Sequence, residues 1–285
     1  MKNIIFSIYI QNNETNLSEK HLNTKLQFEK HLDKLIDVKK EYAKNCNAEF
    51  RLYENDTTYD RFRKKYEGFE FDTINLYKIY LWEKLGKEYD NVLYLDLDVV
   101  PNTTENFFET FDMNKICVYA PNATIDTWSQ KDKKNYKKGK VTWETIVSHK
   151  DKYSEYVKAM CKKAMLVVDN EIDTNYLIAN TAILGGNSIA ISQLKYTDRL
   201  KDMMVVLDKA KDEKFFGEVV SNLFFANNEV FVHYLLDRYK LNWFNLPKDW
   251  HTYLMKKDEV TPEIKNAKMI HLINKKFDEL WTILK

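Results

Sequence analysis

Two aspartates one position apart, Asp96 and Asp98, are the residues whose types and spacing most clearly suggest chemistry. They follow the apolar run Asn91 to Leu95, whose composition is typical of a buried β-strand. Successive side chains of a strand alternate between its faces, so we expect both carboxylates to point the same way. Two such charges repel each other unless a cation lies between them, and carboxylate oxygens suit Mn²⁺ or Mg²⁺. A metal ion held there could in turn bind a diphosphate.

A metal ion at this position needs a third ligand. His271, within the late apolar run Met269 to Leu272, could provide a neutral imidazole. Each residue also has a purely structural interpretation. The aspartates could cap local amides in a turn at the end of the strand, and His271 could be a core histidine with its hydrogen bonds satisfied.

Composition narrows the class of protein. The chain has 285 residues, of which 44% are hydrophobic, enough for one large domain or two modest ones. The 44 Lys and Arg nearly cancel the 43 Asp and Glu, and a net charge of +1 argues against a dedicated nucleic-acid-binding protein. The apolar runs are too short for a membrane helix, which needs about 20 residues. Polar residues from Gln11 onward interrupt the first apolar run, so we expect no signal peptide and no transmembrane segment.

The cysteines Cys46, Cys117 and Cys161 are odd in number and widely spaced. That pattern argues against a disulfide framework and against a structural zinc site. We therefore expect a reducing, cytoplasmic setting.

The first hundred residues alternate strand and helix patterns. Apolar residues at spacings of three and four predict helices, the first capped by Ser18 and the second ended by Gly86. The expected elements are a strand at 4–10, a helix at 18–42, a strand at 48–53, a helix at 71–85 and the strand that ends in the aspartates. This order predicts an α/β sandwich with a largely parallel central sheet. Ligands bind such sheets at the carboxyl ends of strands, where Asp96 and Asp98 lie.

The remainder of the chain continues the alternation less regularly. Strands are expected at 115–120, 176–184, 242–246 and 268–273, and helices at 143–164, 188–211, 228–239 and 277–284. The lysine-rich segment 124–139 is expected to be a mobile loop, either a solvated face or a lid over a substrate. Trp243 is expected in the core, whereas Trp250 could fill the core or stack on a sugar.

The segments Leu76 to Tyr80 and Tyr94 to Val100 together resemble the GT-A glycosyltransferases, particularly glycosyltransferase family 8, the type of glycogenin and the bacterial galactosyltransferases. The resemblance implies a Rossmann-like nucleotide-diphospho-sugar transferase fold, an α/β/α sandwich forming a single catalytic domain over 1–285. Residues 1–120 would form the nucleotide-binding half, and residues 121–285 the acceptor-binding half and C-terminal helix. Asp96 and Asp98 would bind Mn²⁺ or Mg²⁺, which bridges the diphosphate of a nucleotide sugar.

The resemblance extends to two later segments. Asn180 to Leu184 is similar to the strand that lines the family's sugar pocket, and His271 to Lys276 is similar to its late metal- and phosphate-binding element. By position, His271 would be a metal ligand and Lys276 would contact phosphate. The chain departs from the family at Ala182 and Ile273, where glycines are expected, so both positions carry a side chain where the family allows close approach.

Family members place the donor nucleotide along the end of the first strand, here Tyr9, Gln11 and Asn12. Tyr9 could equally belong to the core. Lys78 would face either the donor or solvent, since its spacing from neighbouring residues does not decide between them.

Sugar transfer also needs a carboxylate near the reacting carbon, because the transition state has oxocarbenium character. Glu229, in the segment Asn227-Asn228-Glu229, is the first candidate, and Asp173 and Asp249 are alternatives. The structural interpretation of Glu229 is an acid at a helix N-terminus, where the helix dipole favours it.

The expected function is therefore transfer of a sugar from a nucleoside-diphosphate sugar, expected to be UDP-linked, to a glycan or other hydroxyl acceptor. Two alternatives stay open. One is a non-catalytic carbohydrate-binding relative, which the missing glycines suggest. The other is a phosphatase of the haloacid-dehalogenase type with Asp96 as nucleophile, although that motif normally lies on the first strand of the chain, whereas Asp96 follows two earlier strands.

Overall fold

A computed structural model describes residues 1–11, 19–67, 73–124, 130–138, 140, 142, 145–146, 150–171, 175–212, 221–254, 262–273 and 275–284. Its first part alternates strands and helices as the sequence predicts. The elements are β1 (Asn3–Tyr9), α1 (Glu19–Asn45), β2 (Ala48–Glu54), α2 (Thr57–Lys65), α3 (Thr73–Leu85), β3 (Asn91–Leu95), β4 (Val99–Pro101), α4 (Phe107–Thr110) and β5 (Ile116–Tyr119). The predicted cap Ser18 and the start of the predicted helix at 71–72 lie outside the described residues.

The second part departs further from the expected elements. It contains α5 (Gln130–Lys137), α7 (Lys150–Val168), β6 (Asn180–Asn187), α8 (Ser188–Leu194), α9 (Tyr196–Asp212), α11 (Asn228–Arg238), β7 (Trp243–Asn245), the short 3₁₀ helix η2 (Lys248–Trp250), β8 (Thr252–Leu254), α12 (Pro262–Lys265), β9 (Met269–Leu272) and α13 (Phe277–Ile283). The loop expected over 124–139 was wrong in part, because α5 occupies much of it. The strand expected from 176 begins at Asn180 and runs through Gly185 and Gly186 instead of ending before them.

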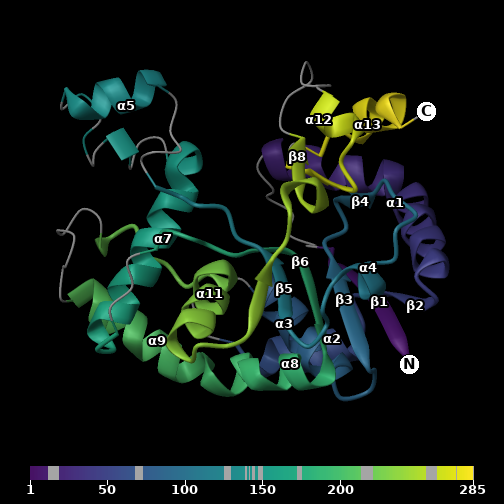
Figure 1. Cartoon of the computed structure of the whole chain (residues 1–285), viewed down its shortest axis with the longest axis horizontal. Coiled ribbons are helices and arrows are strands. Elements are labelled where there is room, and N and C mark those ends of the chain that lie inside the picture. The colour runs from purple at the N-terminus through teal and green to yellow at the C-terminus, as the bar shows by residue number, and fades with distance from the viewer. Residues whose placement is uncertain are drawn as a thin grey trace.

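The central sheet has six strands in the order β2-β1-β3-β6-β5-β7 (Figure 1). Strand β1 is parallel to β2 and β3, and β5 is parallel to β7, whereas β6 is antiparallel to both of its neighbours. The predicted α/β fold with a mostly parallel sheet is confirmed. Strands β4, β9 and β8 form a second, three-stranded sheet beside it. Because β6 lies between β3 and β5, residues from both predicted halves build one sheet, and the division at 120 stays a prediction.

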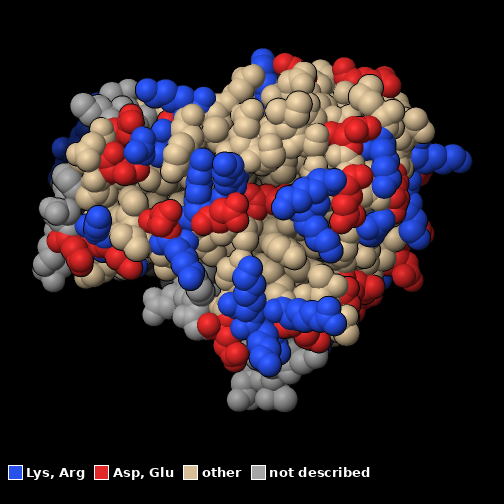
Figure 2. Space-filling model, turned by 90° about the horizontal axis from the view of Figure 1, so that it is seen from below, with Lys and Arg blue, Asp and Glu red and all other residues tan. Residues whose placement is uncertain are grey.

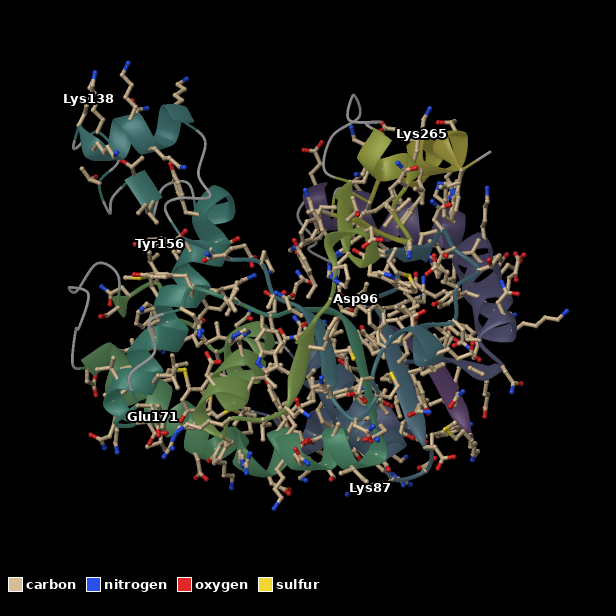
Figure 3. The ribbon with its side chains drawn as sticks, viewed as in Figure 1. Lys87, Asp96, Lys138, Tyr156, Glu171 and Lys265 are labelled. Carbon is tan, nitrogen blue, oxygen red and sulfur yellow. The ribbon has the colours of Figure 1, made fainter. Side chains whose placement is uncertain are left out.

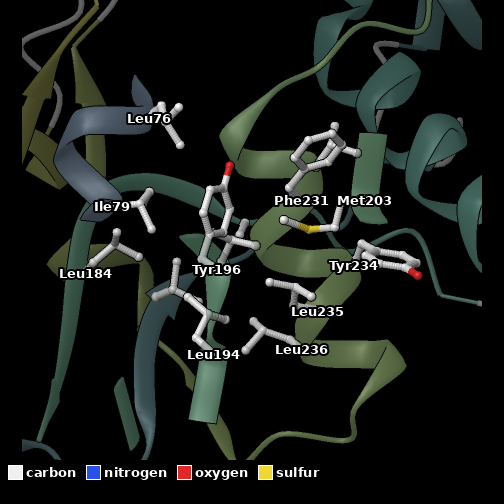
Figure 4. Close-up of a cluster of buried hydrophobic side chains, with 14 of the residues drawn as sticks. Leu76, Ile79, Leu184, Leu194, Tyr196, Met203, Phe231, Tyr234, Leu235 and Leu236 are labelled. Atoms are coloured by element: carbon white, nitrogen blue, oxygen red, sulfur yellow. The ribbon is translucent and has the colours of Figure 1, made fainter. Parts of the chain in front are cut away.

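Alternating side chains of the central strands divide the core into two layers. Val92 and Tyr94 of β3 point into a cluster with α3, α9 and α11, whereas Leu93 and Leu95 point into a cluster with α1 and α4. Figure 4 shows part of the first cluster, where Leu76 and Ile79 of α3 approach Leu184 of β6, Tyr196 of α9 and Phe231 of α11. Each fully buried aliphatic side chain contributes about 1.5–3 kcal/mol to folding, so these layers hold the strand ends in place.

The second sheet packs on the N-terminal helix. Val100, Ile270 and Leu272 form a third cluster with Leu35 of α1 and Phe277 of α13. The late strand β9 is therefore held directly beside the end of β3, and Figure 1 shows β8, α12 and α13 together with α1 on one side of the molecule and α7, α9 and α11 on the other.

The surface carries charges of both signs. On the face seen from below in Figure 2, lysine and arginine side chains lie next to aspartate and glutamate side chains, as the balanced composition leads one to expect. The three cysteines are buried and unpaired. Among the described helices, none has the length and apolar character needed to traverse a lipid bilayer.

Candidate metal centre

Asp96 and Asp98 belong to a turn and not to the strand before it. Strand β3 ends at Leu95, and the Val99 amide donates to the Asp96 carbonyl at 2.9 Å, which closes the turn that leads into β4. The two carboxylates were expected to point the same way because side chains alternate along a strand. That reason is wrong, since both residues lie beyond the end of β3. The side chains nevertheless converge, because the turn folds them toward the same side.

The backbone of this turn is fixed by three other segments. The Asp96 amide donates to the Ala182 carbonyl of β6 at 2.8 Å, and the Leu272 amide of β9 donates to the Asp98 carbonyl at 3.0 Å. The completely buried Lys39 of α1 donates from Nζ to the Leu97 carbonyl at 2.9 Å. Burial lowers the pKa of Lys39 to about 7, although Asp98 and Asp96 oppose that change. The turn is thus tied to both sheets and to α1.

The third predicted ligand joins the two aspartates. Asp96, Asp98 and His271 each offer a ligand atom, and these atoms all lie within 4.8 Å of one another. Register explains the meeting, because Val99 pairs with His271 across β4 and β9. The His271 Nε2 atom lies 3.4 Å from Asp98 Oδ2, and the Asp98 side chain is only 7% exposed. Burial alone would raise the pKa of the Asp98 carboxyl, but Lys275 and His271 hold it well below its usual range. The two carboxylates suit a hard divalent ion such as Mn²⁺ or Mg²⁺, and the imidazole adds a nitrogen ligand that favours a transition metal such as Mn²⁺ over Mg²⁺.

Each aspartate also has an ammonium partner. Lys78 of α3 reaches Asp96 Oδ1 at 3.4 Å, and Tyr94 donates its hydroxyl to the same oxygen. Burial and the neighbouring Asp96 raise the pKa of the Tyr94 phenol well above its ordinary value. The Lys275 ammonium lies directly against Asp98 Oδ2. The Asp98 carboxylate is therefore already paired with a cation.

The lysine that the sequence singled out lies elsewhere. Lys276 makes an ion pair with Glu279 at 3.7 Å, and its side chain is half exposed. The preceding residue, Lys275, is the one that faces the aspartates, because its backbone adopts a left-handed conformation (φ 58°) immediately before α13.

A hollow of about 560 Å³ opens beside Asp96, and we call it the Asp96 hollow. A volume of this size suits a small-molecule ligand. Its lining residues are Ile8, Tyr9, Ile10, Gln11, His21, Thr24, Lys25, Phe28, Ile74, Asn75, Lys78, Tyr94, Asp96, Leu97, Asp98 and Lys275. The predicted nucleotide residues Tyr9 and Gln11 therefore share one hollow with the aspartates, while Asn12 lies outside the described residues. Figure 3 places Asp96 between α7, which carries Tyr156, and the C-terminal elements near Lys265.

Asn180 begins β6 and is almost fully buried. Its side-chain oxygen accepts from the Ala182 amide at 3.0 Å, and Ala182 in turn holds the Asp96 amide. Asn180 thus shapes the strand beside the turn. Ala182 is buried, whereas Ile273 is partly exposed, so of the two substituted glycine positions the first is the one that lies inside the site.

Glu229 lies in a second charged cluster. Lys158 of α7 contacts Glu229 and donates to Glu155 Oε1 at 2.8 Å. Burial and Glu229 raise the pKa of the Glu155 carboxyl, and the other oxygen of Glu155 is shielded from water without a hydrogen-bond partner among the described residues. The Glu229 and Val230 amides both donate to the side-chain oxygen of Asn227, the N-cap of α11.

Tyr253 of β8 packs beside His271. Its ring centroid lies 5.5 Å from that of His271. Burial raises the pKa of the Tyr253 phenol, and the carboxylates of Glu155 and Glu229 raise it further.

Of the other two candidate acids, the structure describes only Asp249. Asp173 lies outside the described residues. Asp249 is half exposed and lies 3.7 Å from Lys268. Trp250, which the sequence left open, is buried against Phe107 and Phe111 and belongs to the core.

Three residues of the centre were missed from the sequence: Lys39, His251 and Lys275. Lys39 follows the apolar positions Leu32, Leu35 and Val38 of the α1 stripe, and its place at the edge of that stripe was the available signal. His251 is completely buried, and its Nε2 lies 3.1 Å from His271 Nδ1.

No family model matches the sequence, and no curated protein matches it. Among solved structures, the chain is similar to a glycosyltransferase involved in the glycosylation of the major capsid of PBCV-1, with 11% identity, a TM-score of 0.42, and coverage of 98% of this chain and 100% of that one. It is similar to mouse xyloside xylosyltransferase 1, with 12% identity, a TM-score of 0.47, and coverage of 95% and 97%. It is also similar to the galactosyltransferase LgtC in complex with donor and acceptor sugar analogs, with 11% identity, a TM-score of 0.42, and coverage of 95% and 87%. Likeness of this degree carries no argument about the chemistry of this chain.

Proposed function

We propose that this chain is a metal-dependent glycosyltransferase that moves a sugar from a nucleoside-diphosphate sugar, with UDP as the expected nucleotide, to a glycan or other hydroxyl acceptor. The observation that carries the proposal is the convergence of Asp96, Asp98 and His271 within 4.8 Å, next to the Asp96 hollow that the two aspartates line. A divalent ion bound by these residues would neutralise the diphosphate leaving group as a Lewis acid.

The residues of the hollow suit a nucleotide diphosphate. Lys78 and Lys275 place two positive charges beside the aspartates, where phosphate oxygens would lie. Tyr9 and Gln11 line the same hollow, where Gln11 offers an amide for the nucleoside, whereas Tyr9 is only 8% exposed and its hydroxyl is buried. In this proposal Lys275 contacts phosphate. The resemblance gave that role to Lys276, but Lys276 is paired with Glu279.

Glu229 is the proposed acid nearest to the reacting sugar carbon. The Lys158 ammonium lies between Glu229 and Glu155 and neutralises part of their charge. Both the fixed orientation and the partial burial of Glu229 suit a carboxylate that must stabilise a developing positive charge. Asp173 stays a predicted alternative.

The test is release of UDP from UDP-glucose and UDP-galactose by the purified protein, with GDP-mannose for comparison, with and without Mn²⁺. We expect Mn²⁺-dependent release that falls at least about 100-fold in Asp98→Ala, because the ion loses a charged ligand. Asp112→Ala is the matched control, since Asp112 is a half-exposed aspartate that precedes β5, at the opposite end of the sheet. A folded Asp98→Ala variant with full activity would contradict the proposal.

The same assays separate the alternatives. Release of phosphate from a simple phosphomonoester, blocked in Asp96→Asn, would favour the phosphatase. Binding of free sugars that needs neither nucleotide nor metal would favour a non-catalytic carbohydrate-binding protein.

A further inference from the structure

Two nitrogen atoms lie close to one oxygen of Asp98. The Lys275 ammonium contacts Asp98 Oδ2, and His271 Nε2 lies 3.4 Å from the same atom. A divalent ion that binds this oxygen of Asp98 together with His271 would compete with the Lys275 ammonium for it. An ammonium and a divalent ion repel each other at such close range, which favours departure of the ammonium.

The two lysines of the centre differ in how firmly they are held. Lys78 is 4% exposed, and its ammonium lies over the Tyr94 ring at 5.3 Å as well as near Asp96. Lys275 is 22% exposed, projects from the short connection between β9 and α13, and also donates to the Leu272 carbonyl at 3.2 Å within that connection. Lys275 is therefore the side chain that can leave its aspartate with little disturbance of the core.

The Asp96 hollow gives the released ammonium a place to go. Lys275 lines this hollow together with Lys78, Tyr9 and Gln11. An ammonium that leaves Asp98 stays at the rim of the hollow, where the phosphates of a nucleotide would offer it anionic oxygens.

We propose that Lys275 is the displaceable counter-ion of Asp98: a divalent ion displaces its ammonium, which then binds the nucleotide diphosphate. The inference rests on the proposed function, since it assumes that this centre binds a metal ion and a nucleotide. It goes further by assigning one side chain to the coupling between the two ligands.

The exchange has a defined thermodynamic consequence. Lys275 opposes a metal ion that binds alone, because the ion must break the contact with Asp98. Nucleotide that binds alone gains little from Lys275, since the ammonium is engaged. With both ligands present, the freed ammonium adds a contact to the diphosphate. Metal and nucleotide therefore strengthen each other's binding by the same factor.

The test measures Mn²⁺ and UDP binding by calorimetry, each ligand alone and in the presence of the other, for wild type, Lys275→Met and Lys276→Met. Methionine keeps most of the length of the side chain and removes its charge, and Lys276→Met is the matched control one residue away. In Lys275→Met we expect Mn²⁺ alone to bind about tenfold tighter or more, UDP alone to bind as in wild type, and the mutual enhancement to fall by a similar factor. Lys275→Gln, a polar neutral variant, should behave as Lys275→Met, and melting temperatures check that all variants are folded.

The outcomes separate this inference from the proposed function. If wild type binds both ligands but Lys275→Met binds Mn²⁺ alone no more tightly, or retains the full mutual enhancement, the exchange is wrong and the proposed function stands. If Lys276→Met gives the same changes, the effect is one of general charge and the assignment to Lys275 is wrong. If wild type binds neither Mn²⁺ nor UDP, the proposed function fails and this inference fails with it.

Discussion

Nε2 of the buried His251 lies 3.1 Å from Nδ1 of His271, on the side of the ring away from Asp98. Burial, followed by the neighbouring His271, lowers the pKa of His251 far below its ordinary value, so His251 is neutral. A neutral His251 can accept a hydrogen from His271 Nδ1. With the hydrogen bond in this direction, His271 Nε2 is unprotonated and faces Asp98, as a metal ligand requires.

Replacing His251 should therefore weaken the binding of a metal ion that His251 does not contact. In His251→Leu, His271 loses the acceptor that orients its ring, and we expect Mn²⁺ affinity to fall by about 10- to 100-fold. His251→Gln keeps a side-chain oxygen that can accept from Nδ1 and should recover part of the loss. Mn²⁺ titrations monitored by electron paramagnetic resonance measure both variants, with circular dichroism to check folding. Equal Mn²⁺ affinity in wild type and His251→Leu would contradict the orienting role.

Glu229→Gln should separate chemistry from ligand binding. The variant keeps the size of the side chain and removes its negative charge, so we expect Mn²⁺ and UDP to bind as in wild type while release of UDP from the sugar nucleotide falls about 100-fold. Glu171→Gln is the control, because Glu171 is a partly exposed acid that pairs with Arg238 at 3.1 Å on the same side of the molecule. A parallel loss of UDP affinity in Glu229→Gln would instead give Glu229 a binding or structural role.

The fold was predictable where local pattern and burial agree. The helical stripe around Leu35 and the apolar runs of β1 and β3 gave the right elements, because their periodicity reflects the faces that they bury. The strand predicted at 176–184 begins four residues before β6. It ends before Gly185 and Gly186, because two adjacent glycines are typical of a turn. In the structure they lie in a strand because bulky neighbours pack on them, a tertiary cause that no local pattern records.

The site was predictable in its ligands and not in the residues that support them. Asp96, Asp98 and His271 carry a pattern that marks them individually, and the register of β4 and β9 unites them. Lys275 could not be chosen over Lys276, because the choice depends on the left-handed backbone at Lys275. His251 could not be connected to His271 either, since the contact depends on how β8 pairs with β9.

Acid should destabilise the protein through His233. This histidine is completely buried beside Trp243, at a ring centroid distance of 5.2 Å, and burial, followed by Lys162, lowers its pKa well below the ordinary 6.5. Asp237 lies 3.6 Å away but is already paired with Lys162 at 2.7 Å, so it does not offset the burial. Below pH 6.5 the unfolded chain takes up a proton that the folded chain refuses, and stability falls as pH falls by about 1.4 kcal/mol per pH unit for this group. Urea unfolding between pH 7.5 and 5 should show a shallower acid loss in His233→Phe, and identical slopes in the two proteins would contradict the prediction.

Gly185→Ala should destabilise the fold through Phe107. A Cβ atom at Gly185 would lie 2.5 Å from Cε1 and 2.9 Å from Cζ of the Phe107 ring, which is fully buried between the sheet and Phe111. The ring can move away only by disturbing its own neighbours, so we expect the free energy of unfolding to fall by about 1–3 kcal/mol. Phe107→Leu removes the ring atoms that clash and has its own cost from the lost packing. If the clash is the cause, the double variant loses less stability in urea unfolding than the two single losses added together, because the two changes meet at one contact. Strictly additive losses would place the cost of the alanine in the backbone of β6 and not in the ring.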